Sequence, residues 1–267
     1  VFAIAARVMG VSGSLQEGEY RLSPAMPLLD IVEILARGEV VLRRVTIPEG
    51  FTAAEIVDAL VGAGVGTREG LHDLVTRGGS RYAYAFLRGS PAGSLEGFLF
   101  PDTYLIPRRL ADRDIVDLFL RHFSSVVVPR WRQTAPHRSL RDVVTMASLI
   151  EREAKVPAER PLIASVLYNR LARGMRLEVD ATVLYALGGH KKVVTYDDLK
   201  VDSPYNTYRY AGLPPGPITN PGLAAIMAAL KPAQTAYLFY VARADGSHVF
   251  SRTFSEHLIA IRKYRGR

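Results

Sequence analysis

The chain has 267 residues, of which 48% are hydrophobic and 22% are charged, and both values are typical of a folded globular protein. Lysine and arginine total 34 against 26 acidic residues, so the net charge is +8 and an anionic partner is favoured. The basic residues are scattered and form no basic arm, so we expect no nucleic-acid partner. The absence of cysteine excludes disulfides, thiolate metal sites and cysteine nucleophiles.

The N-terminal part of the chain alternates strand-like and helix-like patterns. In order, the hydrophobic spacing predicts a strand over 19–22, a helix over 27–37, a strand over 40–47, helices over 52–60 and 69–76, and a loop over 78–93. Thr52, with Glu55 three residues later, has the pattern of a capping box, which satisfies the free amides at a helix start. Gly62 and Gly64 follow that helix rather than a strand, so we interpret them as a helix end and not as a dinucleotide-binding loop.

The segment from Glu96 to Pro107 is dense in aromatic residues and ends in proline, and we expect it to join two domains, 1–106 and 107–267. Beyond it the pattern is mainly helical. The spacing predicts helices over 111–126, 140–155, 158–173, 223–230 and 256–264, a loop over 205–221, and a strand pair over 237–242 and 249–251. The predicted fold class is α+β.

The segment that begins at Val143 places a carboxylate where a core residue is due. Apolar residues at helical spacing line one face, namely Val143, Met146, Ala147 and Ile150. The next position on that face is Glu153, whereas Glu151 and Arg152 are expected to turn toward the flank and the solvent. Burial raises the pKa of a carboxyl, as a general acid at neutral pH requires. Because a buried ion pair also accounts for such a glutamate, periodicity alone does not decide between a catalytic and a structural role.

Polar and aromatic residues that suit a sugar follow this helix. The returning helix carries Asn169 and Arg170, and we expect Asn169 to face the acid. Further candidates for substrate binding lie downstream, namely Asp180, Tyr185, Tyr205, Asn206, Thr207 and Tyr208. Tyrosine rings stack on the apolar faces of pyranoses, amides and hydroxyls bind their polar groups, and a proline-stiffened loop keeps the entropic cost of binding low. The alternative is that these tyrosines pack the loop against the domain.

These segments together resemble a known family. The chain contains, in this order, TIPEGFTAAEIVDAL, EGFLFPDTY, ASLIEREAK, SVLYNRL, MRLEVDATVLYAL, SPYNTYRYAGLPPGPITNPG and HVFSRTFSEH. In these segments, and over nearly its whole length, it resembles the endolytic murein transglycosylases of the YceG-like family. Two positions depart from the expected pattern: Ala181, where a proline is expected after Asp180, and Glu178.

The resemblance implies a small LysM-like N-terminal domain followed by a mainly helical catalytic domain similar to lytic transglycosylases. It carries the catalytic glutamate over to Glu153, with Glu151 as the alternative. The implied reaction cleaves the bond between N-acetylmuramic acid and N-acetylglucosamine and leaves 1,6-anhydro ends, which terminates nascent glycan strands. The alternative function is that of a non-catalytic peptidoglycan-binding scaffold of cell-wall synthesis.

The resemblance also implies a single-pass protein of the inner (plasma) membrane whose catalytic part faces the cell wall. The opening segment VFAIAARVMG is too short to span a bilayer, so we expect the membrane anchor to lie outside this chain. The expected partners are peptidoglycan glycan strands and cell-wall synthases. No cofactor or metal is expected, because the histidines show no ligand spacing: His72, His122, His137, His190, His248 and His257.

Overall fold

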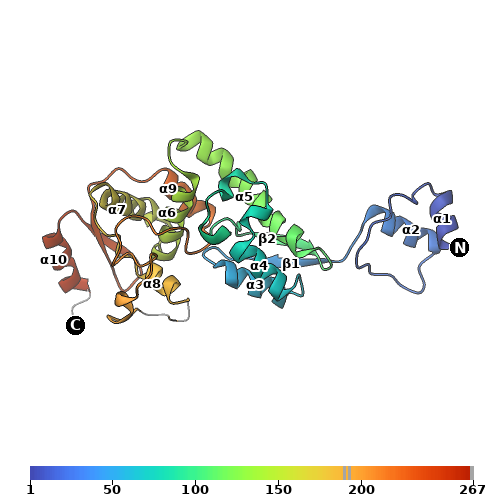
Figure 1. The fold of residues 1–267 in the computed structure, drawn as a ribbon, viewed down its shortest axis with the longest axis horizontal. Coiled ribbons are helices and arrows are strands. Elements are labelled where there is room, and N and C mark those ends of the chain that lie inside the picture. Colours follow the sequence, from blue (N-terminus) through green and yellow to red (C-terminus); the bar gives the residue numbers. More distant parts are fainter. Residues whose placement is uncertain (189–190, 192–193, 265–267) are drawn as a thin grey trace.

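The computed structural model describes residues 1–188, 191 and 194–264, so His190 lies outside the described residues. The molecule is elongated (Figure 1). At its N-terminal end, helices α1 (Phe2–Val8) and α2 (Leu28–Arg37) contact each other and lie apart from the body. Within the described part of the chain, no helix is long and apolar enough to cross a bilayer.

The strand predicted over 19–22 is wrong. These residues form no strand, and the carbonyl of Glu19 accepts one hydrogen bond, 2.7 Å long, from the amide of Val41. The neighbouring strand β1 (Leu42–Thr46) pairs along its whole length with β2 (Thr103–Pro107), and the hydrogen bond to Glu19 comes from Val41, the residue before β1. A segment that meets only the residue before a strand cannot continue a ladder.

A strand–helix–helix–strand unit forms the next part of the body. Helices α3 (Ala53–Gly62) and α4 (Arg68–Arg77) connect β1 to β2, which pair antiparallel from Leu42 with Pro107 to Thr46 with Thr103. The predicted capping box of α3 is confirmed, because the Thr52 side chain accepts from the Glu55 amide and Glu55 accepts from the Thr52 amide. The predicted loop contains three short 3-10 turns, Gly79–Arg81, Ala85–Leu87 and Pro91–Gly93.

The helix predicted over 111–126 is present but longer, since α5 spans Asp112–Thr134 and contains Pro129. Its buried face continues to Val127, and the indole of Trp131 donates to the carbonyl of Arg138 at 2.8 Å. These contacts on both sides of Pro129 keep the helix intact although the proline removes one backbone donor.

Helix α6 (Leu140–Glu153) is the centre of the C-terminal half. It contacts α7 (Arg160–Ala172), α8 (Asp180–Ala186) and α9 (Leu223–Leu230). Every residue from Val143 to Ile150 is buried, so α6 is enclosed on nearly all sides and not along one stripe only. Because α6 is enclosed in this way, its C-terminal end is held in a fixed position, and so is the backbone of the last residue, Glu153.

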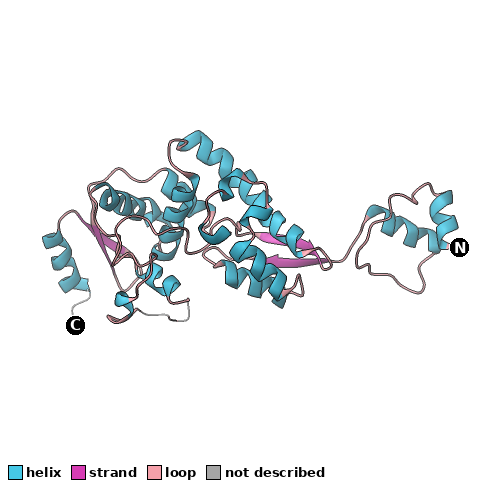
Figure 2. Ribbon diagram, viewed as in Figure 1, coloured by secondary structure: helices cyan, strands magenta, loops and turns pink. Residues whose placement is uncertain are grey.

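The predicted strand pair near the C-terminus is confirmed. Strands β3 (Phe239–Ala242) and β4 (His248–Ser251) pair antiparallel, and Gly246 has a φ of 84° at the turn. Helix α10 (Phe254–Tyr264) contacts both strands. Figure 2 shows the two small sheets lying apart among the helices, and the α+β class is confirmed.

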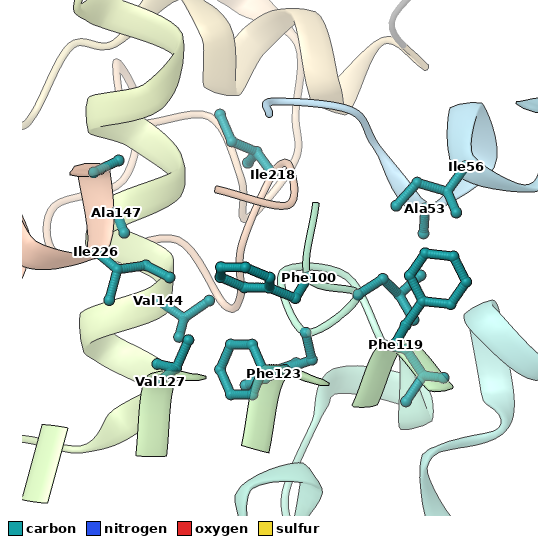
Figure 3. Packing of buried hydrophobic residues seen from close by; sticks show 14 of the residues in the cluster. Ala53, Ile56, Phe100, Phe119, Phe123, Val127, Val144, Ala147, Ile218 and Ile226 are labelled. Atoms are coloured by element: carbon teal, nitrogen blue, oxygen red, sulfur yellow. The ribbon is translucent and has the colours of Figure 1, made fainter. Parts of the chain in front are cut away.

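A single cluster of buried apolar side chains runs through both halves of the body, from Val45 to Leu230. In Figure 3, Phe119 and Phe123 of α5 lie between side chains of α3 and side chains of α6 and α9. The predicted division into 1–106 and 107–267 stays a prediction, and the buried cluster continues across that point.

Candidate functional site

A cleft of about 210 Å³ opens at the C-terminal end of α6. Its wall comes from α6, α7, the segment before α8, the first residue of α8, the loop before α9, β3 and α10. The lining residues are Glu153, Arg170, Leu177, Glu178, Asp180, Tyr208, Tyr240, Val241, His257 and Ile261. Most of the titratable ones are acids or tyrosines, so the cleft contrasts with the basic chain around it.

Glu153 is the last residue of α6 and is partly buried at this cleft. The hydroxyl of Tyr240 donates a hydrogen bond of 2.8 Å to its Oε2 atom. Burial raises the pKa of Glu153 above its ordinary value of 4.5, and the charge of Asp180 raises it further, whereas the Tyr240 hydrogen bond lowers it. Glu153 therefore keeps its proton to a higher pH than an exposed glutamate, as a general acid must.

Asp180 and Tyr208 form a second carboxylate–tyrosine pair in the same cleft. The hydroxyl of Tyr208 donates to Oδ1 of Asp180 at 2.5 Å. Burial raises the pKa of Tyr208, and the hydrogen bond to Asp180 raises it further, so the phenol stays protonated and remains a donor. The cleft therefore offers a carboxylate acceptor and hydroxyl groups to a polar ligand.

Arg170 holds one wall of the cleft together. Its Nε atom donates to the carbonyl of Leu238 at 2.7 Å, and its Nη1 atom donates to the carbonyls of Arg176 and Leu177 at 3.1 and 3.0 Å. The same Nη1 lies 3.1 Å from Oε2 of Glu178, whose φ of 53° is in the left-handed region. The strained backbone at Glu178 is thus held by the arginine beneath it.

Glu151 has different surroundings. Its Oε1 atom lies 3.2 Å from Nη2 of Arg160, and its Oε2 accepts from the amide of Gly222 at 3.0 Å. Its side chain is only 7% exposed, so the prediction that Glu151 turns toward the solvent is wrong, while Arg152 is exposed as expected. The error has a physical cause: because α6 is enclosed on nearly all sides, a side chain outside the predicted apolar stripe can still be buried.

The structure brings three of the predicted substrate contacts together with Glu153, namely Arg170, Asp180 and Tyr208. Asn169 does not line this cleft. Its Nδ2 atom donates to the carbonyls of Thr235 and Tyr237, both at 2.9 Å, and so ties α7 to the segment before β3.

The remaining candidates lie in the framework behind the cleft. Asn206 is fully buried and donates to the carbonyls of Leu199 and Val201 at 2.9 and 2.8 Å. Thr207 is buried and accepts from the amide of Val179 at 3.0 Å. These two residues hold the loop against the segment that carries Glu178 and Asp180.

Tyr185 and Tyr205 lie against each other, with ring centroids 4.9 Å apart, and neither lines the cleft of Glu153. Burial raises the pKa of each, and the nearby buried carboxyl of Glu96 raises it further. Glu96 itself accepts from the Ala53 amide and from the Asn220 side chain. This group therefore joins α3 to the loop before α9.

The comparisons with known proteins agree with this architecture. The model of the YceG-like family matches residues 1–263. The chain belongs to the YceG-like family. It is 47% identical over 174 residues to an endolytic murein transglycosylase of Bacillus subtilis, a match that covers 64% of this chain and 48% of the relative. It is 30% identical over 265 residues to an endolytic murein transglycosylase of Streptococcus pneumoniae, covering 88% of this chain and 48% of the relative.

The YceG-like chain thus spans about half the length of the curated relatives it matches. A solved structure is also similar, that of a putative yceG-like protein from Listeria monocytogenes. It has a TM-score of 0.74 and 36% sequence identity, and the match covers 97% of this chain and 89% of that one.

Several cleft residues of this YceG-like protein were missed from the sequence, above all Tyr240. Tyr240 lies on a correctly predicted strand, and an alternating pattern shows that neighbouring side chains face opposite sides. The pattern does not show which side meets the end of α6. In the sequence, Glu178 stands out only as a departure from the family pattern. In the structure it lines the cleft and forms an ion pair with Arg170.

Proposed function

We propose that this protein is an endolytic lytic transglycosylase that cuts the glycan strands of peptidoglycan, with Glu153 as the proton-transferring group. The observation that carries the proposal is a partly buried carboxyl with a raised pKa, at a cleft lined by polar groups. The names of the relatives from Bacillus subtilis and Streptococcus pneumoniae support the same activity. Glu151 is the weaker candidate, because both of its oxygens are engaged by Arg160 and Gly222.

In the proposed reaction, protonated Glu153 donates its proton to the oxygen between N-acetylmuramic acid and N-acetylglucosamine. The bond from the muramoyl C1 to that oxygen breaks, and the N-acetylglucosamine leaves with a free hydroxyl. Glu153, now a carboxylate, takes the proton from the muramoyl 6-hydroxyl as that oxygen bonds to C1. The product is a 1,6-anhydro ring, Glu153 is protonated again, and no water is consumed. One carboxyl thus suffices where hydrolases use two.

The other cleft residues have supporting roles in this proposal. Asp180 raises the pKa of Glu153 and so favours the protonated acid at the start of the reaction. Tyr208, held by Asp180, presents a flat ring and a hydroxyl to the sugar. Arg170 holds the wall between β3 and Glu178 in place.

Further proposals concern the protein in the cell. We propose that the strand–helix–helix–strand unit from β1 to β2 is a LysM-like domain that binds glycan. We also propose a single-pass anchor in the inner (plasma) membrane, a catalytic part that faces the cell wall, cell-wall synthases as partners, and termination of nascent strands as the result. The resemblance to the family supports these proposals, and the net charge of +8 suits an anionic wall polymer.

Mass spectrometry of digested peptidoglycan tests the activity. We expect anhydro products, and we expect Glu153→Gln to abolish them while the exposed α5 variant Asp114→Asn cuts as the unmodified protein does. Products one water heavier would replace the transglycosylase with a hydrolase. Binding to glycan with no change of strand length would leave the non-catalytic scaffold as the function.

A further inference from the structure

We propose that Tyr240 is a positioning residue for Glu153, one that occupies Oε2 and thereby leaves Oε1 as the oxygen that carries and delivers the proton. This inference rests on the proposed function, because it concerns how the same carboxyl is aimed. It assigns a role to a residue that stands 87 positions away from Glu153 in the chain.

The first support is the geometry of the contact. The Tyr240 hydroxyl lies 2.8 Å from Oε2 of Glu153, and within the described residues this is its only hydrogen bond. Burial and the neighbouring Glu153 both raise the pKa of Tyr240 well above 10, so the phenol keeps its proton. A phenol with one acceptor within reach donates to it, and Oε2 then accepts. The acid proton of Glu153 therefore resides on Oε1.

The second support is the rigidity of the tyrosine. Tyr240 pairs with Phe250 in the ladder of β3 and β4, and its ring meets the ring of His248 edge-on at 5.3 Å. His248 is itself fixed by Glu159, which binds its backbone amide at 3.0 Å and its Nδ1 atom at 2.7 Å. The hydroxyl that holds Glu153 is therefore carried by a fixed ring on a fixed strand, as a positioning role requires.

The third support is how the contact acts as the charge changes. When Glu153 has given up its proton, the hydrogen bond from Tyr240 becomes charge-assisted and stabilises the carboxylate. Asp180 acts in the opposite direction and favours the protonated form. The titratable and charged groups around Glu153 come from its own helix and from every packed element: Arg152, Arg170, Glu178, Asp180, Tyr208, Tyr240, His248 and His257.

The cleft contains a matched contrast. Tyr208 also lines it, but its hydroxyl is bound to Asp180 and not to Glu153. Tyr237 precedes the same strand, and its ring contacts Phe250 and the Arg252 guanidinium outside the cleft lining. Replacement of Tyr237 by phenylalanine removes a hydroxyl from the same region without touching the acid.

The test compares Tyr240→Phe with Tyr237→Phe in the whole chain. For Tyr240→Phe we expect kcat on glycan strands to fall about 10- to 100-fold, the effect of losing a hydrogen bond to a charged group, while KM changes less than about 2-fold. In the unmodified protein the Tyr240 hydrogen bond lowers the pKa of Glu153. Its removal should raise this pKa, so the alkaline limb of the pH profile should move to higher pH. Tyr237→Phe should leave kcat and the limb unchanged.

A second measurement is independent of activity. The carboxyl carbon of Glu153, labelled with carbon-13, is titrated by NMR without substrate, and its midpoint should rise in Tyr240→Phe. If that variant is poorly folded, a ring-fluorinated tyrosine at position 240 alone keeps the packing and makes the phenol a stronger donor, so the midpoint should fall. An unchanged midpoint, or a kcat equal to that of the unmodified protein, would overturn the inference. Intact peptidoglycan with the unmodified protein would instead refute the proposed function, and the titration would still report on the pair.

Discussion

Arg160 and Glu151 form an ion pair of 3.2 Å in which the side chains are only 13% and 7% exposed. Glu153, two residues further along the same helix, is bound by a neutral tyrosine hydroxyl instead. Two glutamates of one helix end are therefore held in different ways: Glu151 is paired with a largely buried guanidinium, whereas Glu153 is hydrogen-bonded by a phenol and has its pKa raised by burial. The difference separates a structural acid from a candidate catalytic one.

The first prediction concerns stability at these two positions. Glu151→Gln should lower the free energy of unfolding by about 2–4 kcal/mol, because removing one partner of a buried pair leaves the other charge uncompensated. This expected loss is smaller than that for an isolated buried pair, because a carboxylate oxygen of Glu49 also lies 3.9 Å from Arg160 and partly compensates its charge. Urea unfolding measures it, and Glu153→Gln serves as the comparison that should not be destabilised. A stable Glu151→Gln that no longer cuts peptidoglycan, beside an active Glu153→Gln, would reverse our assignment.

The second prediction concerns pH. The pKa of Glu153 is raised in the folded protein, so the folded state holds this proton over a range in which the unfolded state has lost it. The contribution of this group to stability is complete below the ordinary pKa of 4.5 and is lost as the pH rises through the folded pKa. Glu153→Gln has no such loss. The melting temperature of Glu153→Gln minus that of the unmodified protein should therefore increase from pH 4 to pH 8, and a flat difference would show that the pKa is not raised.

The third prediction separates two tyrosines of one loop. Tyr208 lines the cleft and binds Asp180, whereas Tyr205 packs against Tyr185 outside it. We expect Tyr208→Phe to lower kcat/KM on glycan strands by about 10-fold, the effect of one lost hydrogen bond, and Tyr205→Phe to change it less than about 2-fold. Steady-state kinetics on both variants decides the matter. Equal losses would mean that the substrate groove extends to Tyr205.

The fourth prediction concerns the close packing of Gly97 against α6 and the loop before α9. Gly97 has a φ of +87°, and a Cβ atom there would meet the Cγ of Pro217 at 2.4 Å and the Cγ1 of Val144 at 2.9 Å. Gly97→Ala should lower the free energy of unfolding by about 2–4 kcal/mol through backbone strain and overpacking. Gly64→Ala is the matched control, since Gly64 has a φ of +73° with nothing within 4 Å, and it should cost about 1 kcal/mol. Similar losses in the two variants would show that the close approach to Pro217 is unimportant.

The sequence by itself determined the local features, because these depend on neighbours in the chain. The spacing of apolar residues predicted α6, α7 and α9, and Thr52 with Glu55 predicted the start of α3. The resemblance of several ordered segments predicted the family. Periodicity brought Glu153 forward as the candidate, but it placed Glu151 in solvent, because a helical pattern does not show how many sides of a helix are covered.

Only the tertiary structure decided which side chains meet. Tyr240 reaches Glu153 across 87 residues, and Arg160 reaches Glu151 after a turn between two helices. Asn206 and Thr207 have polar side chains that could bind a sugar, but these side chains form hydrogen bonds with backbone groups of the protein itself. Hydrogen bonds are short and directional, so a partner is fixed by three-dimensional placement and not by residue type. The sequence therefore shows which side chains have the chemistry to bind or cleave a substrate, and the tertiary structure decides which of them are free to contact it.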